Sequence, residues 1–256
     1  LFHREHRYDV RGEIAFIFLA RPHRRNAWTG RMHSEYRFLL DKANNDRSVG
    51  AIVVSGEGDS FCVGGDSQAL QGHSARGSYD SGVSSDIALP GYGIDERFDA
   101  TFAYHYGLNK PIIAAINGAA AGVGLALAAF ADIRFAVPKA KLTTAHGKLN
   151  LPAEYGLSWV LPRIVGLGRA NDLLLTSRVF LSEEAEKIGF VNQLFSSEQL
   201  LHEAEGYARE LVKNISPDSL RQTRWQIYRD QHDAVARSVE KSEELLESMM
   251  KDEHFR

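Results

Sequence analysis

Two glycine-flanked segments of this sequence could present backbone N–H groups to a ligand. The first, Phe61–Asp66, places Val63 before two glycines, and the second, Ala121–Leu125, has Val123 between two glycines. Glycine lets a backbone approach a ligand closely. Val123 also opens an apolar run that predicts a helix, and the first N–H groups of a helix have no partner within it. Donors of this kind can stabilise a developing negative charge.

Two titratable side chains follow these segments. His146 and Glu154 lie eight positions apart, on either side of a Leu-Pro-Ala turn. An imidazole exchanges a proton near neutral pH, and a carboxyl group does so when its surroundings raise its pKa. Glu154 could instead cap a helix, and His146 could be a hydrogen-bonded structural residue. Both remain candidates for acid–base chemistry.

The segment from Gly122 to Gly124 could also begin a dinucleotide-binding fingerprint. Leu127 stands where the third glycine or alanine of that fingerprint belongs. No acidic residue follows about 20 positions later, where the fingerprint places one. The sequence therefore argues against a dinucleotide site.

Strand and helix patterns alternate around these candidates. Apolar runs predict strands at residues 13–19, 49–55, 112–117 and 133–136. Helical spacing and caps predict helices at residues 32–44, 96–106, 155–176 and 182–188, and an all-apolar, buried helix from residue 125. Ser182 is the expected N-cap of the helix at 182–188. Beyond these, only helices are expected, at residues 197–213, 216–229 and 232–251. This order predicts an α/β core with a C-terminal helical extension.

One long irregular stretch interrupts the alternation. Residues 72–95 are rich in Gly, Ser and Asp, and a short helix at 67–71, capped by Asp66, is expected before them. Long loops inside a compact domain often form lids or binding walls, and a plain surface loop is the alternative. His73 is the one histidine of this stretch and has no partner ligands near it, so no metal site is expected.

Composition and charge are those of an ordinary globular protein. Of 256 residues, 44% are hydrophobic and 25% charged, and the formal net charge is −3. This balance argues against a nucleic-acid-binding protein. The apolar stretch at 112–131 is broken by Asn117 and three glycines, which predicts buried core and no membrane span. The single cysteine, Cys62, excludes an internal disulfide, and a reducing, cytoplasmic setting is expected.

Several segments, in order along the chain, resemble motifs of the crotonase superfamily, the enoyl-CoA hydratase/isomerase family. The matching segments are Arg21–Ala27, Phe61–Asp66, Lys110–Gly118, Ala121–Leu125, Ala131–Ile133, Leu161–Gly166 and Leu175–Val191. Each motif alone is weak, but their order and spacing together are fairly specific. The resemblance covers roughly residues 10–200.

The resemblance implies a fold and an assembly. The fold is a crotonase-like spiral of strand-strand-helix repeats that forms two near-perpendicular sheets. Residues 1–196 would form the spiral core with an acyl-CoA site, and residues 197–256 a helical trimerisation region. The expected assembly is a homotrimer or a dimer of trimers. Members usually continue past a segment like Glu253–Arg256, so a truncated or disordered tail is expected.

The resemblance also assigns roles to the two glycine-flanked segments. It implies that the N–H groups of Val63 and Val123 form an oxyanion hole for a thioester oxygen, with Gly64 and Gly122 beside the substrate. The family more often has glycine or alanine at the two valine positions. Valine keeps the N–H group but adds bulk, which would narrow the pocket or redirect the acyl chain.

Both glutamates of the hydratase pattern are missing in this register. They would fall on Ala126 and His146, and an alanine cannot transfer a proton. Glu154 matches the position of a catalytic aspartate in the family's dienoyl-CoA isomerases and 4-chlorobenzoyl-CoA dehalogenases. The family's carbon–carbon hydrolases use a histidine and an aspartate close to these positions, with a tryptophan that resembles Trp28.

Together these assignments predict an acyl-CoA enzyme that stabilises a thioester enolate. Glu154 is the expected principal acid–base group and His146 the second, while Arg24 and Arg25 would face the CoA phosphates and Trp28 the substrate. Hydration or double-bond isomerisation is the leading hypothesis for the reaction. A carbon–carbon or thioester hydrolase, or a weakly catalytic CoA-thioester binder, is the alternative. No cofactor beyond the coenzyme A of the substrate, no metal, no nucleic acid and no membrane are expected.

Overall fold

The computed structural model describes residues 4–67 and 88–251. The expected helix at 67–71, with the exception of its first residue, lies outside this range. So do His73 and the irregular stretch up to residue 87. The tail at 252–256 also lies outside the described residues.

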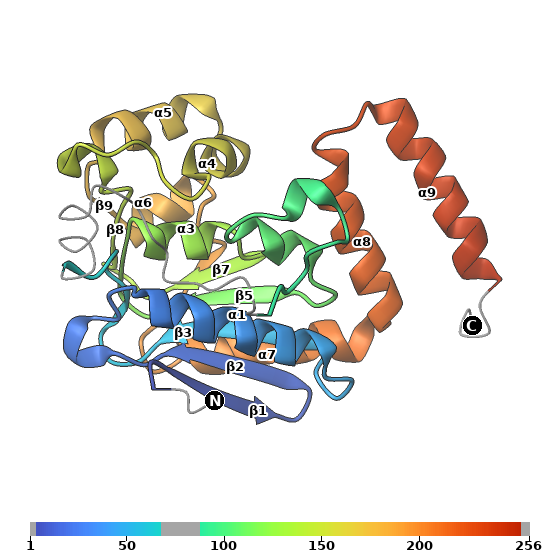
Figure 1. Cartoon of the computed structure of the whole chain (residues 1–256), viewed down its shortest axis with the longest axis horizontal. Helices are drawn as coiled ribbons and strands as arrows, with labels where there is room; N and C mark the ends of the chain where they lie inside the picture. Colours follow the sequence, from blue (N-terminus) through green and yellow to red (C-terminus); the bar gives the residue numbers. More distant parts are fainter. Residues whose placement is uncertain (1–3, 68–87, 252–256) are drawn as a thin grey trace.

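Two sheets organise the core (Figure 1). The larger sheet has the spatial order β1 (His6–Arg11), β2 (Ile14–Leu19), β3 (Ala51–Gly56), β5 (Ile112–Ile116), β7 (Ile133–Ala136) and β10 (Gln193–Leu194). The smaller sheet has the order β4 (Ser60–Cys62), β6 (Ala119–Ala121), β8 (Lys141–Thr143) and β9 (Phe180–Leu181). Strands β3, β5 and β7 are each followed by a strand of the smaller sheet. This winding confirms the predicted α/β spiral.

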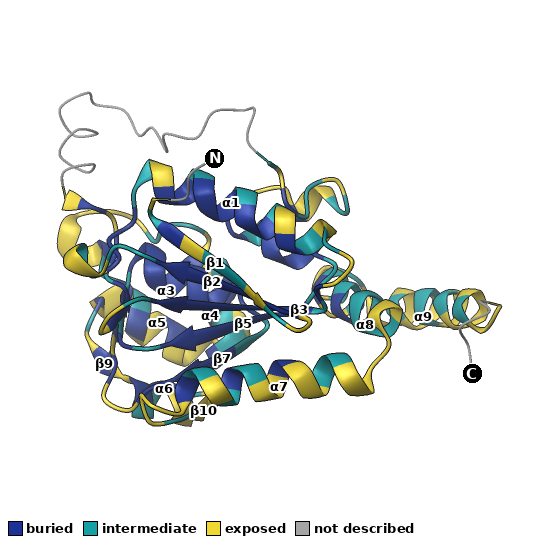
Figure 2. Cartoon of the chain, turned by 90° about the horizontal axis from the view of Figure 1, so that it is seen from below, coloured by how far each residue is buried: buried dark blue, intermediate teal, exposed yellow. Residues whose placement is uncertain are grey.

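Helices cover both faces of the larger sheet, which explains why its central strands are apolar throughout. Successive residues of β2 point to opposite sides, so Ile17 enters one hydrophobic core and Phe16 enters the other. The first core includes α1 (Gly30–Asn45), and the second includes α7 (Leu200–Asn214). Figure 2 shows α1 and α7 on opposite sides of the buried strands.

The prediction of one helix at residues 96–106 is wrong. This segment forms two short 3-10 helices, η2 (Glu96–Phe98) and η3 (Ala103–Gly107). Phe102, Tyr104 and Tyr106 are all buried, and an α-helix cannot turn residues at this two-residue spacing to one core. Tertiary packing of aromatic rings therefore overrides the local helical signal.

Two other predicted helices differ in their boundaries. The helix expected at 155–176 divides into α4 (Leu157–Val165) and α5 (Leu167–Thr176), because Gly166 lies between them at φ +81°. Ser182 is the first residue of α6 (Ser182–Lys187), and Leu181 is its N-cap, so the predicted cap is wrong. The Ser182 hydroxyl instead accepts a hydrogen bond from the Ala140 N–H at 3.1 Å.

The last two described helices are α8 (Pro217–Asp230) and α9 (Val235–Met250), as the helical pattern predicted. Arg224 and Tyr228 of α8 bind the Asp132 carboxylate, which anchors this helix to the core. By contrast, α9 buries no residue and reaches away from the body of the molecule (Figures 1 and 2).

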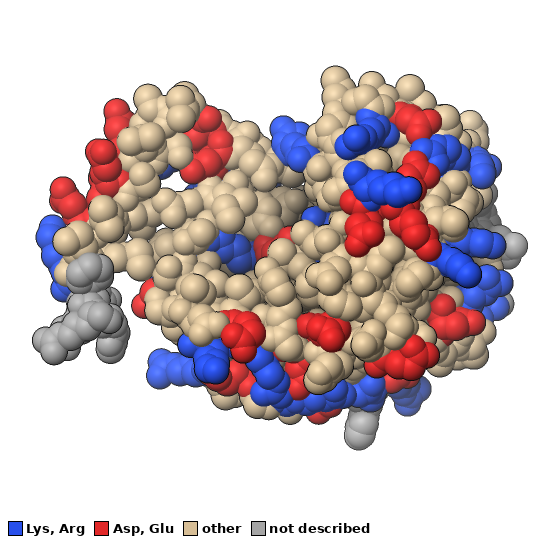
Figure 3. All heavy atoms as spheres, turned by 180° about the vertical axis from the view of Figure 1, so that it is seen from behind, with Lys and Arg blue, Asp and Glu red and all other residues tan. Residues whose placement is uncertain are grey.

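Figure 3 shows acidic and basic side chains intermingled on one face, where neither sign covers a continuous area among the coloured residues. Within residues 4–67 and 88–251, no helix is both long and apolar enough to cross a membrane.

Candidate active site

Two neighbouring parallel strands carry the two glycine-flanked segments at their carboxyl ends. Strand β4 pairs in parallel with β6, so the segments of Val63 and Val123 leave the same edge of the smaller sheet. A Cβ atom on Gly64 would lie 3.6 Å from the carbonyl oxygen of Ala121. The segments therefore lie in van der Waals contact, at the sheet edge where α/β proteins commonly bind ligands.

Val123 is the first residue of α3 (Val123–Ala129), and Gly122 precedes it with φ +50° and ψ −117°. Its N–H group donates no hydrogen bond within the part of the chain that the structure describes. A Cβ atom on Gly124 would lie 2.1 Å from the Cys62 carbonyl oxygen, so only glycine permits this contact between α3 and β4. The helix start is thereby fixed, and its first N–H stays free.

The Val63 N–H group has an internal acceptor, which the sequence did not indicate. It donates to the Arg25 carbonyl oxygen at 3.3 Å, beyond the usual range for such bonds. On the same loop, the Trp28 N–H donates to the Gly64 carbonyl at 2.8 Å, and the Asp66 N–H donates to the Trp28 carbonyl at 2.9 Å. An N–H group can be shared between two acceptors, so a long bond leaves room for a second one.

Asn26 holds the loop that faces Val63, a role that motif comparison did not single out. It is fully buried, and both Arg25 and Asn26 adopt left-handed backbone conformations, with φ +49° and +55°. The Asn26 side chain accepts a hydrogen bond from the Arg21 N–H at 2.8 Å and donates to the Glu57 and Ser60 carbonyls at 2.9 and 2.8 Å. Asparagine tolerates this backbone region better than most residues, which is the signal the sequence carried.

Glu154 and His146 lie close enough to influence each other. His146 begins η4 (His146–Leu149) and is 8% exposed, and its buried Nδ1 atom has no hydrogen-bond partner among the residues that the structure describes. Burial raises the pKa of Glu154, and the nearby His146 opposes that rise. A carboxyl group whose pKa is moved toward neutrality, beside an imidazole, is suited to acid–base catalysis. Ala126 is fully buried in α3 and brings no titratable group here.

The capping alternative for Glu154 is not realised. Gly156 is the N-cap of α4, and no described side chain makes a capping hydrogen bond there. The Glu154 backbone carbonyl accepts a hydrogen bond from the Leu157 N–H at 3.0 Å. Its carboxylate, in contrast, receives no hydrogen bond from any described residue, so the side chain has no structural task that the contacts reveal.

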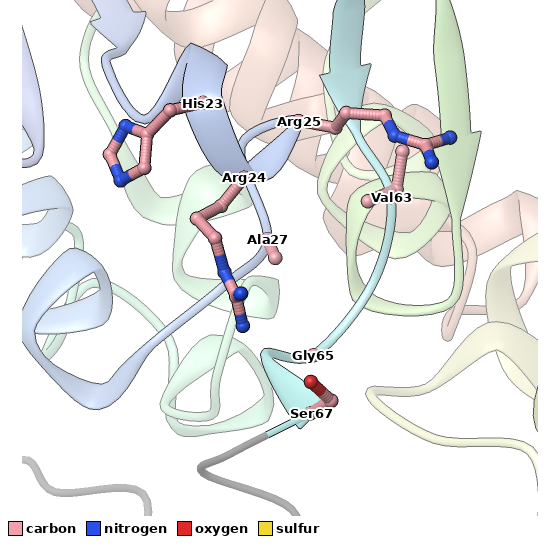
Figure 4. A pocket seen from close by; sticks show the side chains of 7 residues that line it. All are labelled: His23, Arg24, Arg25, Ala27, Val63, Gly65 and Ser67. Carbon is pink, nitrogen blue, oxygen red and sulfur yellow. The ribbon is translucent and has the colours of Figure 1, made fainter.

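A cleft of about 520 Å³ lies beside the Val63 segment and η1 (Pro22–Arg24). Figure 4 shows Arg24 reaching toward Gly65 and Arg25 extending past Val63. The Arg24 guanidinium lies 3.4 Å from the Asp66 carboxylate, whereas Arg25 has no ion-pair partner among the described residues. Two guanidinium groups in one cleft are suited to phosphate oxygens. The cleft is lined by His23, Arg24, Arg25, Ala27, Val63, Gly65 and Ser67.

Trp28 lies behind this loop in an aromatic cluster and does not line the cleft. Its ring packs edge-to-face against Phe102, Tyr36 and His33 at centroid distances of 5.7, 5.8 and 6.0 Å. The Trp28 indole N–H is buried and finds no hydrogen-bond partner within residues 4–67 and 88–251. Burial, and then the charge of Arg37, lowers the pKa of His33 to about 4, so this imidazole is neutral at physiological pH. The sequence offered only helical spacing at His33, which predicts no function.

In the described parts of the chain, no group of three or more His, Cys, Asp or Glu side chains could hold a metal ion.

The chain is similar to known proteins over most of its length. Residues 9–256 match the family described as enoyl-CoA hydratase/isomerase. The chain is 32% identical to the 1,2-epoxyphenylacetyl-CoA isomerase of Escherichia coli K12 over 199 residues, covering 78% of this chain and 72% of that protein. It is 37% identical over 194 residues to a Mycobacterium tuberculosis protein named "probable enoyl-CoA hydratase echA12", covering 75% of this chain and 65% of that protein.

Solved structures share the fold. A crystal structure of the enoyl-CoA hydratase EchA12_1 from Mycobacterium marinum has a TM-score of 0.68 at 32% identity, covering 88% of this chain and 98% of the other. The Pseudomonas aeruginosa protein PA4980 has a TM-score of 0.80 at 28% identity, with coverages of 95% and 99%. These matches confirm the crotonase-like fold expected from the sequence motifs. The family match over nearly the whole chain and the relatives above 30% identity show that this chain belongs to the enoyl-CoA hydratase/isomerase family.

Proposed function

We propose that this chain is a coenzyme A thioester enzyme that stabilises an enolate. The N–H groups of Val63 and Val123 hold the thioester oxygen, and Glu154 moves the proton. The observation that carries this proposal is the free Val123 N–H at the start of α3, against the Gly64 segment. An anionic oxygen at this point gains from the unpaired donor and from the positive end of the helix.

Double-bond isomerisation is the reaction that this arrangement supports best. The Glu154 carboxylate takes a proton from C2 of a 3-enoyl thioester, and the electrons move into a dienolate whose oxygen lies between the two amides. Glu154 then returns the same proton to C4, which gives the 2-enoyl thioester. One carboxyl group suffices for both steps, and the raised pKa of Glu154 brings it closer to the optimum for proton transfer near neutral pH.

Hydration needs a second group to orient water, and His146 is the available one. The unpartnered Nδ1 atom of His146 beside Glu154 also favours the second candidate, a carbon–carbon or thioester hydrolase. Ala126 keeps a third candidate open, a thioester-binding protein with weak catalysis. The relatives named isomerase and hydratase support isomerisation and hydration over the thioester-binding protein.

The coenzyme A phosphates are assigned to Arg24 and Arg25 in the 520 Å³ cleft, with Gly64 and Gly122 at the thioester. No cofactor beyond the coenzyme A of the substrate is part of this proposal. Trp28 is assigned a supporting place behind the substrate loop, because it packs on Phe102 and does not line the cleft. A cytoplasmic setting fits the single Cys62, a buried free thiol.

A homotrimer or a dimer of trimers is part of the same proposal. The region from residue 197 would mediate assembly, because α9 leaves Val235, Val239 and Leu246 exposed at 79%, 49% and 57%. A helix with an unpartnered apolar stripe is expected to pack on another surface. Sedimentation of the wild-type chain measures the mass of the assembly, and a monomer at micromolar concentration would contradict this part.

Glu154→Gln tests the reaction. The variant keeps the shape of the side chain and removes its acid–base capacity, so the rate of 3-hexenoyl-CoA isomerisation should fall by about 10²–10⁴-fold. Glu13→Gln is the matched control, because Glu13 is exposed in the turn between β1 and β2 and should leave the rate unchanged. Crotonyl-CoA hydration is measured in parallel. Equal rates for Glu154→Gln and wild type in both assays would remove Glu154 from the mechanism.

A further inference from the structure

An aromatic pocket of about 330 Å³ lies next to the candidate acid–base residue and is not used by the mechanism above. Its walls come from η2, η3, the end of α3 and the start of α4. Figure 1 shows the segment of η2 and η3 between α3 and α8. The pocket is lined by Arg97, Phe98, Ala100, Thr101, Ala103, Tyr106, Phe130, Tyr155, Gly156, Trp159 and His232.

The chain itself connects this pocket to the site. Tyr155 and Gly156 line the pocket and directly follow Glu154, so the pocket wall begins within about 7 Å of the Glu154 Cα atom. The Tyr155 ring also packs on Phe102 at a centroid distance of 5.5 Å, and Phe102 packs on Trp28 at 5.7 Å. Packed aromatic rings therefore link the loop beside the Val63 segment to Tyr155 in the pocket wall.

The lining selects an apolar occupant. Tyr106 lies 5.3 Å from Phe130 and 6.2 Å from Trp159 between ring centroids, so these rings present faces and edges to the same space. Among the described residues, no acidic side chain lines the pocket, and the charge of Arg97 is neutralised by Asp95 through hydrogen bonds at 2.7 and 2.8 Å. A dry cavity of about 150 Å³ accepts benzene, so the larger volume here accommodates a ring with several methylenes.

We propose that this pocket binds the apolar end of the acyl group, and that the substrates are thioesters with a medium-length or aryl-terminated acyl chain. This inference rests on the proposed function, because the thioester must lie at Val63 and Val123 for its chain to reach Tyr155. The acyl end is favoured over other occupants because Tyr155 and Gly156, which line the pocket, directly follow Glu154 in the chain. A second copy of the chain as occupant is an outcome that the test distinguishes.

Saturated thioesters test the pocket without turnover. Calorimetry compares acetyl-CoA, decanoyl-CoA and 5-phenylpentanoyl-CoA on the wild type, on Thr101→Trp and on Thr101→Val. Thr101→Trp fills the pocket, and Thr101→Val, which keeps the volume, is the matched control. We expect both long thioesters to bind the wild type and Thr101→Val at least about tenfold more tightly than acetyl-CoA. Thr101→Trp should lose this difference while its affinity for acetyl-CoA stays within about twofold.

Each other outcome has a defined meaning. Equal binding of short and long thioesters by the wild type overturns the pocket assignment alone, and so does a Thr101→Trp variant that keeps the difference. A changed mass of Thr101→Trp with the difference retained assigns the pocket to a second copy and overturns the proposal. Failure of the wild type to bind any of the three thioesters overturns the coenzyme A function itself. Ala103→Phe is the second filling variant, used if Thr101→Trp does not fold.

Discussion

Replacing Val123 with proline would remove one N–H group from the candidate oxyanion hole with little other change. Val123 is the first residue of α3, where proline is favoured and where the backbone N–H has no partner within the helix. Gly122 lies at φ +50° and ψ −117°, outside the α region that a following proline disfavours, and it has no Cβ atom to clash with the proline ring. Proline also keeps three side-chain carbons, as valine does. The substitution therefore deletes a donor and little else.

The size of the effect follows from these contacts. Loss of one oxyanion-hole donor costs about 10²–10³-fold in kcat. Val123→Ala is the control, because it keeps the N–H group and removes two carbons of a side chain that is 3% exposed. That control should lose about 2 kcal/mol of stability, a fall in Tm of about 4–8 °C, and little activity. Val123→Pro should show the opposite pattern, a large loss of kcat with a smaller change in Tm.

The assay is steady-state isomerisation of 3-hexenoyl-CoA, with circular dichroism melting of each variant. A kcat for Val123→Pro within about threefold of that for Val123→Ala, in folded proteins, would refute the role of this amide. The Val63 N–H, which already has the Arg25 carbonyl as acceptor, would then also be unsupported as the second donor.

Two further predictions concern the pH response and the supporting loop. Burial raises the pKa of Glu154, so its ionised form destabilises the folded state: its contribution to stability is full below the unfolded value of 4.5 and is lost as pH rises through the folded pKa. Glu154→Gln should therefore melt above wild type at pH 7, an advantage that vanishes below pH 4.5, and a Tm deficit at pH 7 would contradict this. Asn26→Ala leaves the Arg21 N–H and two carbonyls unpaired and puts alanine at φ +55°. We expect a loss of about 3 kcal/mol, a fall in Tm of about 6–12 °C, whereas an unchanged Tm would refute this role of the Asn26 side chain.

Long apolar runs predicted their elements well. The strands expected at 13–19, 49–55 and 133–136 correspond to β2, β3 and β7, because strands buried on both faces leave a continuous apolar signal. The strands of the smaller sheet have two or three residues each, too short to show a period, and were not predicted from the pattern. The helix predicted at 96–106 was wrong because the local pattern is helical, whereas packing between distant aromatic rings decides the structure of this segment.

Some residues of the candidate site could likewise be predicted from the sequence, and others could not. The two glycine-flanked segments were readable because glycine marks close backbone approach, and the structure places them together. His33 carried no comparable signal, because it lies at ordinary helical spacing. Asn26 carried only the general tolerance of asparagine for a left-handed backbone, and its role depends on the carbonyl groups of residues 57 and 60. The acceptor of the Val63 N–H likewise lies on a separate loop.

The sequence by itself determined the α/β class, the family, the buried helix that starts at Val123 and the absence of titratable groups at Ala126. These features are local, because they depend on residue type, spacing and order along the chain. Only the tertiary structure decided that the Val63 N–H donates a hydrogen bond to the Arg25 carbonyl, that Glu154 lies near His146, and that an aromatic pocket lies beside Tyr155. Such facts depend on contacts between distant segments, and local preferences do not specify which groups meet when the chain packs.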